Sequence, residues 1–177
     1  MEHSEGYEYF VRKDTDKSAG VVEARALAIQ VLNILKRSDV VAAISAAHHV
    51  GASSHSIQSS ILKDMEILGF TSERKGLFAD FKVPGIRPDY FKPLTEGGIL
   101  FEVERGKTIA NNMDLLDVWK THICKDANHL FLLVPRVRRT HKGTEQRIFN
   151  TVVNRVGTFF TEGVTQVDVN SVHIFGY

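Results

Sequence analysis

The residues most able to do chemistry are two glutamates, Glu102 and Glu104, at the end of the apolar segment 99–104. Side chains alternate across a strand, so Glu102 and Glu104 would share one face. Two carboxylates held so close raise each other's pKa, and a divalent cation relieves the repulsion because Mg²⁺ prefers oxygen ligands. The pattern predicts a metal-binding strand. The alternative is an edge strand that leaves both glutamates in solvent.

A third carboxylate, Asp89, stands in the segment Arg87-Pro88-Asp89-Tyr90-Phe91, and twelve residues separate it from Glu102. The intervening Glu96–Gly98 segment is typical of a turn. A hairpin across this turn would bring Asp89 beside Glu102, where both reach one ion. That geometry is needed for metal-assisted hydrolysis of a phosphodiester.

Pro88-Asp89, the spacer and Glu102-Val103-Glu104 resemble the signature of the PD-(D/E)xK nucleases. The family usually has lysine where this chain has Glu104, and the E-x-E form is similar to that of BamHI-like restriction endonucleases. The resemblance covers about residues 54–135. It implies that Asp89, Glu102 and the carbonyl of Val103 hold Mg²⁺, with Mn²⁺ as a substitute. It further implies that Glu104 positions or deprotonates the attacking water, that DNA is the substrate, and that the protein is a homodimer.

The missing family lysine removes a cation from beside the scissile phosphate. Lys107, just beyond the strand, and Lys120, on the next expected helix, are the two candidates to replace it, and sequence alone does not choose between them. Glu66 corresponds to a helical acidic residue that some family members add to the metal shell. The alternative is a surface glutamate.

Several positively charged and amide side chains are candidates to contact DNA. They are Arg87, Arg105, Asn111, Asn112, Lys120, Arg136, Arg138 and Arg139. The two asparagines precede a helix whose N-terminus favours phosphate, although ordinary capping explains them equally well. The last three arginines belong to a basic run, 136–142, that is also typical of a solvated loop. The net charge of +1 does not by itself argue for nucleic acid.

The order of apolar patterns predicts an α/β domain with a mixed central sheet flanked by helices, as in a restriction endonuclease-like core. Residues 1–18 are polar and aperiodic, so we expect a loosely attached tail there. The expected helices are 19–36, 40–47 (capped by Ser38-Asp39), 56–68 (ended by Gly69), 111–125 and 144–160. The expected strands lie within 70–82, 86–94, 99–104, 129–134 and 164–174. Residues 1–53 would form an arm and helices packed on a nuclease core, 54–177, in one compact domain.

Composition agrees with a globular protein, with 43% hydrophobic and 24% charged residues. No apolar run approaches the roughly 18 residues of a membrane span. The single cysteine, Cys124, has no internal disulfide partner, so we expect a cytoplasmic protein.

The nuclease hypothesis covers restriction or defence as well as repair. Two other functions stay open. Residues 20–82 also resemble a winged-helix DNA-binding module, in which the third helix would present Gln58, Ser59 and Lys63 to the major groove. The chain would then be a regulator. Alternatively, it has a degenerate nuclease fold that binds DNA without cutting.

Overall fold

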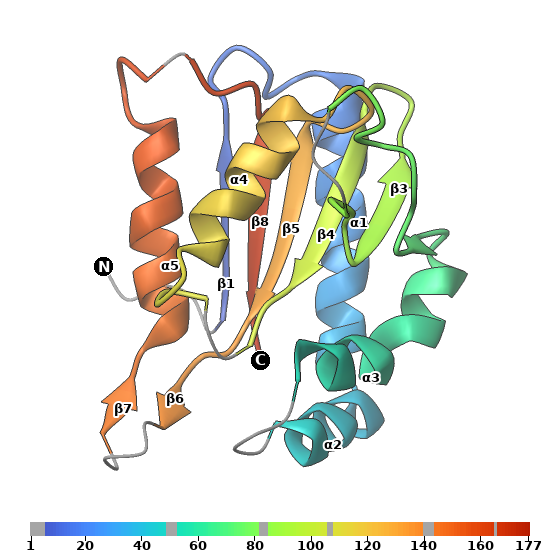
Figure 1. Ribbon diagram of the computed structural model, residues 1–177, viewed down its shortest axis with the longest axis vertical. Coiled ribbons are helices and arrows are strands. Elements are labelled where there is room, and N and C mark those ends of the chain that lie inside the picture. Colours follow the sequence, from blue (N-terminus) through green and yellow to red (C-terminus); the bar gives the residue numbers. More distant parts are fainter. Residues whose placement is uncertain (1–5, 49–52, 82–84, 106–107, 140–143, 165) are drawn as a thin grey trace.

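A computed structural model describes most of the chain, namely residues 6–48, 53–81, 85–105, 108–139, 144–164 and 166–177. The sheet lies between two layers of helices (Figure 1). Helices α1 to α3 cover one face, and α4 and α5 cover the other. Among the described residues, no helix is long and apolar enough to cross a membrane.

The central sheet has six strands in the order β1-β8-β5-β4-β3-β2. The three inner strands β4, β5 and β8 are parallel, and the outer strands run antiparallel to their neighbours. The bounds are β1 Tyr7–Val11, β2 Thr71–Ser72, β3 Tyr90–Pro93, β4 Gly98–Val103, β5 His129–Val134 and β8 Ser171–Gly176. A separate ribbon pairs β6 Arg138–Arg139 with β7 Glu145–Gln146. The predicted mixed sheet is confirmed.

Five α-helices are described, and a short 3₁₀ turn, Thr158–Phe160, follows the last of them. Their bounds are α1 Ala19–Leu35, α2 Ser38–Ala47, α3 Ser54–Ile67, α4 Met113–Ile123 and α5 Ile148–Gly157. Each predicted helix is present, with ends that differ from the expectation by a few residues. Helix α3 ends as predicted at Gly69, whose φ of 84° suits glycine.

Strand alternation divides the core into two parts. Ile99, Phe101 and Val103 of β4 pack toward α1–α3, whereas Leu100 packs on the side of α4 and α5. Strand β5 is buried along its whole length, as its unbroken apolar run predicts. Glu102 therefore projects from β4 into the layer between the sheet and α4, where a charge is costly.

Three expectations about local structure are wrong. Residues 7–11 are not part of a tail but form edge strand β1, paired with β8. Their burial does not alternate cleanly, which explains the weak signal. Only residues 71–72 of the expected 70–82 strand are extended, because that strand pairs with β3 for just two positions. The last strand starts at Ser171 rather than Val164.

The capping of α2 also differs from the expectation. Arg37, rather than Ser38 or Asp39, precedes the first turn, and no side chain caps the helix. Asp39 lies inside the first turn, where a negative charge is favourable, and pairs with Arg37 at 2.7 Å.

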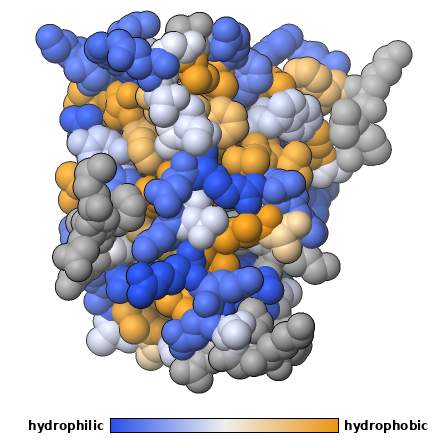
Figure 2. Space-filling view, turned by 90° about the vertical axis from the view of Figure 1, so that its left-hand side faces the viewer, coloured by the Kyte–Doolittle hydropathy of each residue, from blue (hydrophilic) through white to orange (hydrophobic). Residues whose placement is uncertain are grey.

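The face that carries α5 mixes surface types. Hydrophilic residues separate the hydrophobic ones into several areas on this side of the molecule (Figure 2). The coloured residues of this view therefore do not form one continuous apolar surface of the kind that a large obligate interface needs.

Two histidines are buried in the layer between the sheet and α1. His173 accepts or donates a hydrogen bond at 2.8 Å between Nδ1 and the hydroxyl of Tyr7, and His129 pairs with Ser171 at the same distance. Burial lowers the pKa of His173 to about 3 and that of His129 to about 4. Both imidazoles are therefore neutral in the folded protein at neutral pH.

Acid should destabilise the fold through these histidines. A histidine whose pKa is 6.5 when unfolded and about 3 when folded loses its stabilising contribution as pH falls below 6.5. We expect His173 to contribute about 2 kcal/mol to the stability lost between pH 7 and pH 5, or roughly 4–8 °C in Tm. Thermal melts of His173→Phe should show a smaller loss by that amount. An equal loss in both proteins would contradict the assignment.

Candidate active site at the carboxyl end of strand β4

The β3–β4 hairpin brings Asp89 beside Glu102. Tyr90 pairs with Phe101 in the antiparallel register, so the preceding residue of β3 lies opposite Glu102. The backbone N–H of Asp89 donates to Glu102 Oε2 at 3.4 Å, and that of Val103 donates to Asp89 Oδ2 at 2.7 Å. The predicted hairpin across Glu96–Gly98 is confirmed.

Lys120 joins this carboxylate pair from helix α4. Its Nζ lies 2.9 Å from Glu102 Oε1 and 3.2 Å from Asp117 Oδ1. The three side chains are well shielded, with 17%, 6% and 1% of the Lys120, Glu102 and Asp117 side chains exposed. Because β4 leads into α4, and α4 leads into parallel β5, the crossover holds Lys120 over the end of β4.

The site holds more carboxyl groups than its one lysine can neutralise. Burial first, and then the charges of Asp117 and Asp89, raise the pKa of Glu102 well above its ordinary value, against the opposing effect of Lys120. Burial raises the pKa of Asp117 to about 6, again opposed by Lys120. Burial also raises the pKa of Asp89, against the Val103 hydrogen bond. The site therefore retains protons that a bound cation would displace.

The charge on Lys120 itself is secure. Burial lowers the pKa of its ammonium, but the charges and hydrogen bonds of Glu102 and Asp117 outweigh that effect and raise it overall. The arrangement therefore places a permanent positive charge next to Glu102 and within the electrostatic reach of Asp89.

Glu104 lies one residue beyond β4 and belongs to the same electrostatic group. Its backbone N–H donates to Leu133 O at 2.8 Å, and its carbonyl accepts from the Tyr177 hydroxyl at 3.1 Å. Burial first, followed by the charges of Asp117 and Asp89, raises the pKa of Glu104 to about 8. A carboxyl that titrates near neutrality is suited to accept a proton.

Helix α3 and the loop after it fix the backbone of Asp89. Its carbonyl accepts a hydrogen bond from Gln58 Nε2 at 3.2 Å and another from the N–H of Glu73 at 2.8 Å. The Tyr90 hydroxyl donates to the carbonyl of Gln58 at 2.5 Å. These bonds make Gln58 a supporting residue of the site.

A second buried carboxylate on α4 anchors the helix. Asp114 is fully buried, and Arg155 of α5 approaches it with Nε 3.3 Å from Oδ2. Arg155 also donates to the Asn112 side chain at 2.6 Å and to the carbonyl of Ile109 at 3.3 Å. The segment before α4 is thereby tied to α5, which fixes the helix that carries Lys120.

Sequence reasoning missed Gln58 as a support and Asp114 and Asp117 altogether. The signal for the two aspartates is their spacing. Asp114, Asp117 and Lys120 recur every three residues, which places them on one side of a helix. Polar residues on the side of α4 that faces the sheet would have indicated a buried polar site.

The predicted metal residue Glu66 does not join the site. It is exposed on α3, eight residues past Gln58, which corresponds to about 12 Å along the helix axis. Gln58, not Glu66, is the α3 side chain that contacts Asp89. Lys107, one of the two candidate lysines, lies outside the described residues.

The predicted DNA-contacting residues are spread around the site. Arg87 is exposed and pairs with Glu73 at 3.3 Å, and Asn111 is exposed just before α4. Asn112 has a positive φ of 55° and binds Arg155, so capping of the last turn before α4 is not done by its side chain. Arg105 follows Glu104, and its charge acts on His48 and Tyr177.

The basic run lies beyond the end of β5. Arg136 is exposed and donates to the carbonyl of Gly176 at 3.2 Å. Arg138 and Arg139 are the two residues of β6. The rest of the run, residues 140–142, lies outside the described residues. This ribbon projects from the same edge of the sheet as the carboxyl ends of β4 and β5 (Figure 1).

The donor chemistry of the site fits a hard divalent cation. All the acidic ligands there are oxygen donors, and apart from Lys120 the buried oxygens of Asp117 have no hydrogen-bond partner within the described part of the chain. In that same part, no group of three or more His, Cys, Asp or Glu forms a metal cage. Mg²⁺ commonly needs only one or two carboxylates, with water and substrate phosphate completing its shell. Asp89 and Glu102 are such a pair.

No protein-family model, curated protein or solved structure matches this chain. The account of the site therefore depends on its own geometry.

The raised pKa of Glu104 predicts a loss of stability with rising pH. An acid with a pKa of 4.5 when unfolded and about 8 when folded stabilises the fold fully below pH 4.5, and this contribution disappears as pH rises toward 8. Allowing for its partial exposure, we expect about 2 kcal/mol, or roughly 4–8 °C in Tm, between pH 5 and pH 8. Glu104→Gln should escape this loss in the absence of divalent ions. The exposed Glu162→Gln is the matched control, and identical behaviour of all three proteins would refute the burial of Glu104.

Proposed function

We propose that this protein is a magnesium-dependent DNA endonuclease with a restriction endonuclease-like core. The observation that carries the proposal is the convergence of Asp89, Glu102 and Lys120 at the end of β4. Two acids and a lysine at one edge of a sheet are the set that the PD-(D/E)xK resemblance implies. The carboxyl ends of strands are also where open α/β sheets commonly bind ligands.

The topology supports the same proposal. The order α3-β2-β3-β4-α4-β5 is helix, three strands, helix and strand, which is the order that the resemblance implies. Strands β2, β3 and β4 are joined antiparallel, and β5 is added parallel to β4 through α4. The two acids lie on adjacent strands of this arrangement, and the lysine lies on the crossover helix.

Lys120 is our choice for the lysine that the signature lacks. Glu104 occupies the usual position two residues after Glu102, and an ammonium on α4 reaches the same place from above the strand. Its distance of 2.9 Å from Glu102 puts it where a phosphate bound at the Asp89–Glu102 pair would lie. A cation at that position offsets the negative charge of the reacting phosphate.

Each residue then has a distinct task. Asp89, Glu102 and the carbonyl of Val103 would hold Mg²⁺ or Mn²⁺, and when bound the ion offsets phosphate charge and lowers the pKa of water. Glu104 accepts the proton of the attacking water, for which its raised pKa suits it. Asp117 keeps Lys120 oriented from the same helix. Restriction or defence is the role we favour, with a homodimer that supplies one site per DNA strand.

The winged-helix alternative has less support. It needs Gln58 on the surface of α3, but this side chain is buried against the Asp89 carbonyl. It also needs a strand pair after α3, whereas the described residues from 70 to 81 contain the single short strand β2, which pairs with β3.

Plasmid nicking tests the proposal directly. Wild-type protein should nick supercoiled DNA with Mg²⁺ or Mn²⁺ and not with EDTA. Glu102→Gln should abolish nicking. Lys120→Met and Glu104→Gln should each reduce the rate by about 100-fold or more, because each removes one charge-stabilising or proton-accepting group. The exposed Glu66→Gln serves as the control and should keep the wild-type rate.

Two results would count against the proposal. Nicking that persists in Glu102→Gln would place the activity elsewhere or in a contaminant. DNA binding without nicking under any divalent ion would favour a degenerate nuclease fold.

A further inference from the structure

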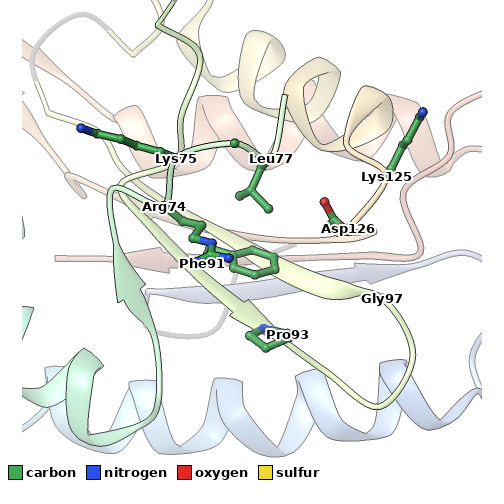
Figure 3. Close-up of a pocket in the computed structure, with 9 residues that line it drawn as sticks. Arg74, Lys75, Leu77, Phe91, Pro93, Gly97, Lys125 and Asp126 are labelled. Carbon is green, nitrogen blue, oxygen red and sulfur yellow. The ribbon is translucent and has the colours of Figure 1, made fainter. Parts of the chain in front are cut away.

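A basic cavity lies beside the candidate active site along the same hairpin (Figure 3). Its volume is about 610 Å³. The lining residues combine cations, apolar side chains and two glycines, and they are Arg74, Lys75, Gly76, Leu77, Phe91, Pro93, Gly97, Lys125 and Asp126. None of these residues belongs to the site described above.

The cavity and the site open on the same side of β3. Asp89, Phe91 and Pro93 alternate along one extended segment, so their side chains leave the same face. Phe91 packs in the core layer of α4 and α5, the layer into which Glu102 points. At about 3.4 Å per residue, the cavity begins about 7 Å from Asp89 and extends to about 14 Å. One DNA strand advances about 3.4 Å along the helix axis per phosphate, so this span corresponds to two to four nucleotides.

The loop that carries Arg74 and Lys75 is attached to the site. Glu73 has a φ of 46°, and its N–H donates to the carbonyl of Asp89 at 2.8 Å. Arg87 pairs with the carboxylate of Glu73 at 3.3 Å. The basic loop is therefore held in register with the candidate ligand Asp89 by backbone and side-chain contacts.

The cavity carries an excess of positive charge. Lys125 pairs with Asp80 at 2.6 Å, whereas Arg74 and Lys75 have no ion pair among the described residues. Figure 3 shows Arg74 directed toward Phe91, and Lys75 and Lys125 directed outward at its margins. The only acid in the lining is Asp126. Unpaired cations around an apolar floor favour an anion with an attached organic group.

We infer that this cavity binds the DNA backbone two to four nucleotides from the scissile phosphate. Arg74 and Lys75 contact phosphate oxygens, and Leu77 and Phe91 line the space for the adjoining sugar. The inference rests on the proposed function, since it takes the reacting phosphate to lie at Asp89 and Glu102. It assigns the hairpin a second task, which is to position the strand as well as to hold the metal ligands.

Salt-dependent DNA binding tests the inference. The probe is a fluorescein-labelled duplex of about 20 base pairs, measured by anisotropy with Ca²⁺ in place of Mg²⁺. We expect the double variant Arg74→Ala with Lys75→Ala to bind roughly tenfold more weakly and to show a slope of log K against log[salt] smaller by about 1 to 2. Both side chains are exposed, so the Tm should not change. The control, Lys17→Ala with Lys63→Ala, removes the same charge from exposed positions outside the cavity and should bind like wild type.

The outcomes separate the inference from the proposed function. Equal weakening in both double variants would reduce the effect to net charge and overturn the inference. Unchanged binding and slope in the cavity variant would overturn it too, while Mg²⁺-dependent nicking would leave the nuclease intact. Loss of binding only in the cavity variant, together with a wild-type protein that never nicks, would support the inference and refute the nuclease. Displacement of the duplex by inorganic phosphate at millimolar concentration would show a small-anion site and overturn the assignment to DNA.

Discussion

The contact between Lys120 and the buried carboxylates of Glu102 and Asp117 determines how this protein is built around its site. Removing one partner from a buried ion pair costs about 3–5 kcal/mol, yet a complete pair adds little net stability over apolar residues of similar size. Stability alone therefore does not account for placing three ionisable groups between β4 and α4. A role in binding a charged substrate does.

That contact constrains the surrounding elements. The β3–β4 hairpin must hold Asp89 against Glu102, and the Asp89 carbonyl is fixed from α3 and from the loop at Glu73. Helix α4 must keep Lys120 over the strand end, and the Asp114–Arg155 contact ties it to α5. The site is thus assembled from both helical layers and from the sheet, although its acids come from one hairpin. A basic cavity along the same hairpin extends the region able to contact a polyanion.

Much of this arrangement could be predicted from the sequence, because it depends on short-range patterns. Strand alternation placed Glu102 on the side opposite Phe101, and the Glu96–Gly98 turn placed Asp89 beside Glu102. The apolar run of β5 has the predicted bounds. Strand β1 was not predictable in this way, since an edge strand that pairs with the far end of the chain has no clear periodicity. The choice of Lys120 over Lys107 depends on how far α4 leans over β4, which is a tertiary property. The support from Gln58 depends on the packing of α3 in the same way.

The measurement that tests this account most directly is a crystal structure of the protein with Mn²⁺, using the anomalous signal of the ion. The account predicts one peak between the Asp89 and Glu102 carboxylates, with the Lys120 ammonium withdrawn from Glu102 and still in contact with Asp117. A structure that holds no ion there at high Mn²⁺ concentration, with Lys120 still bound to Glu102, would contradict it.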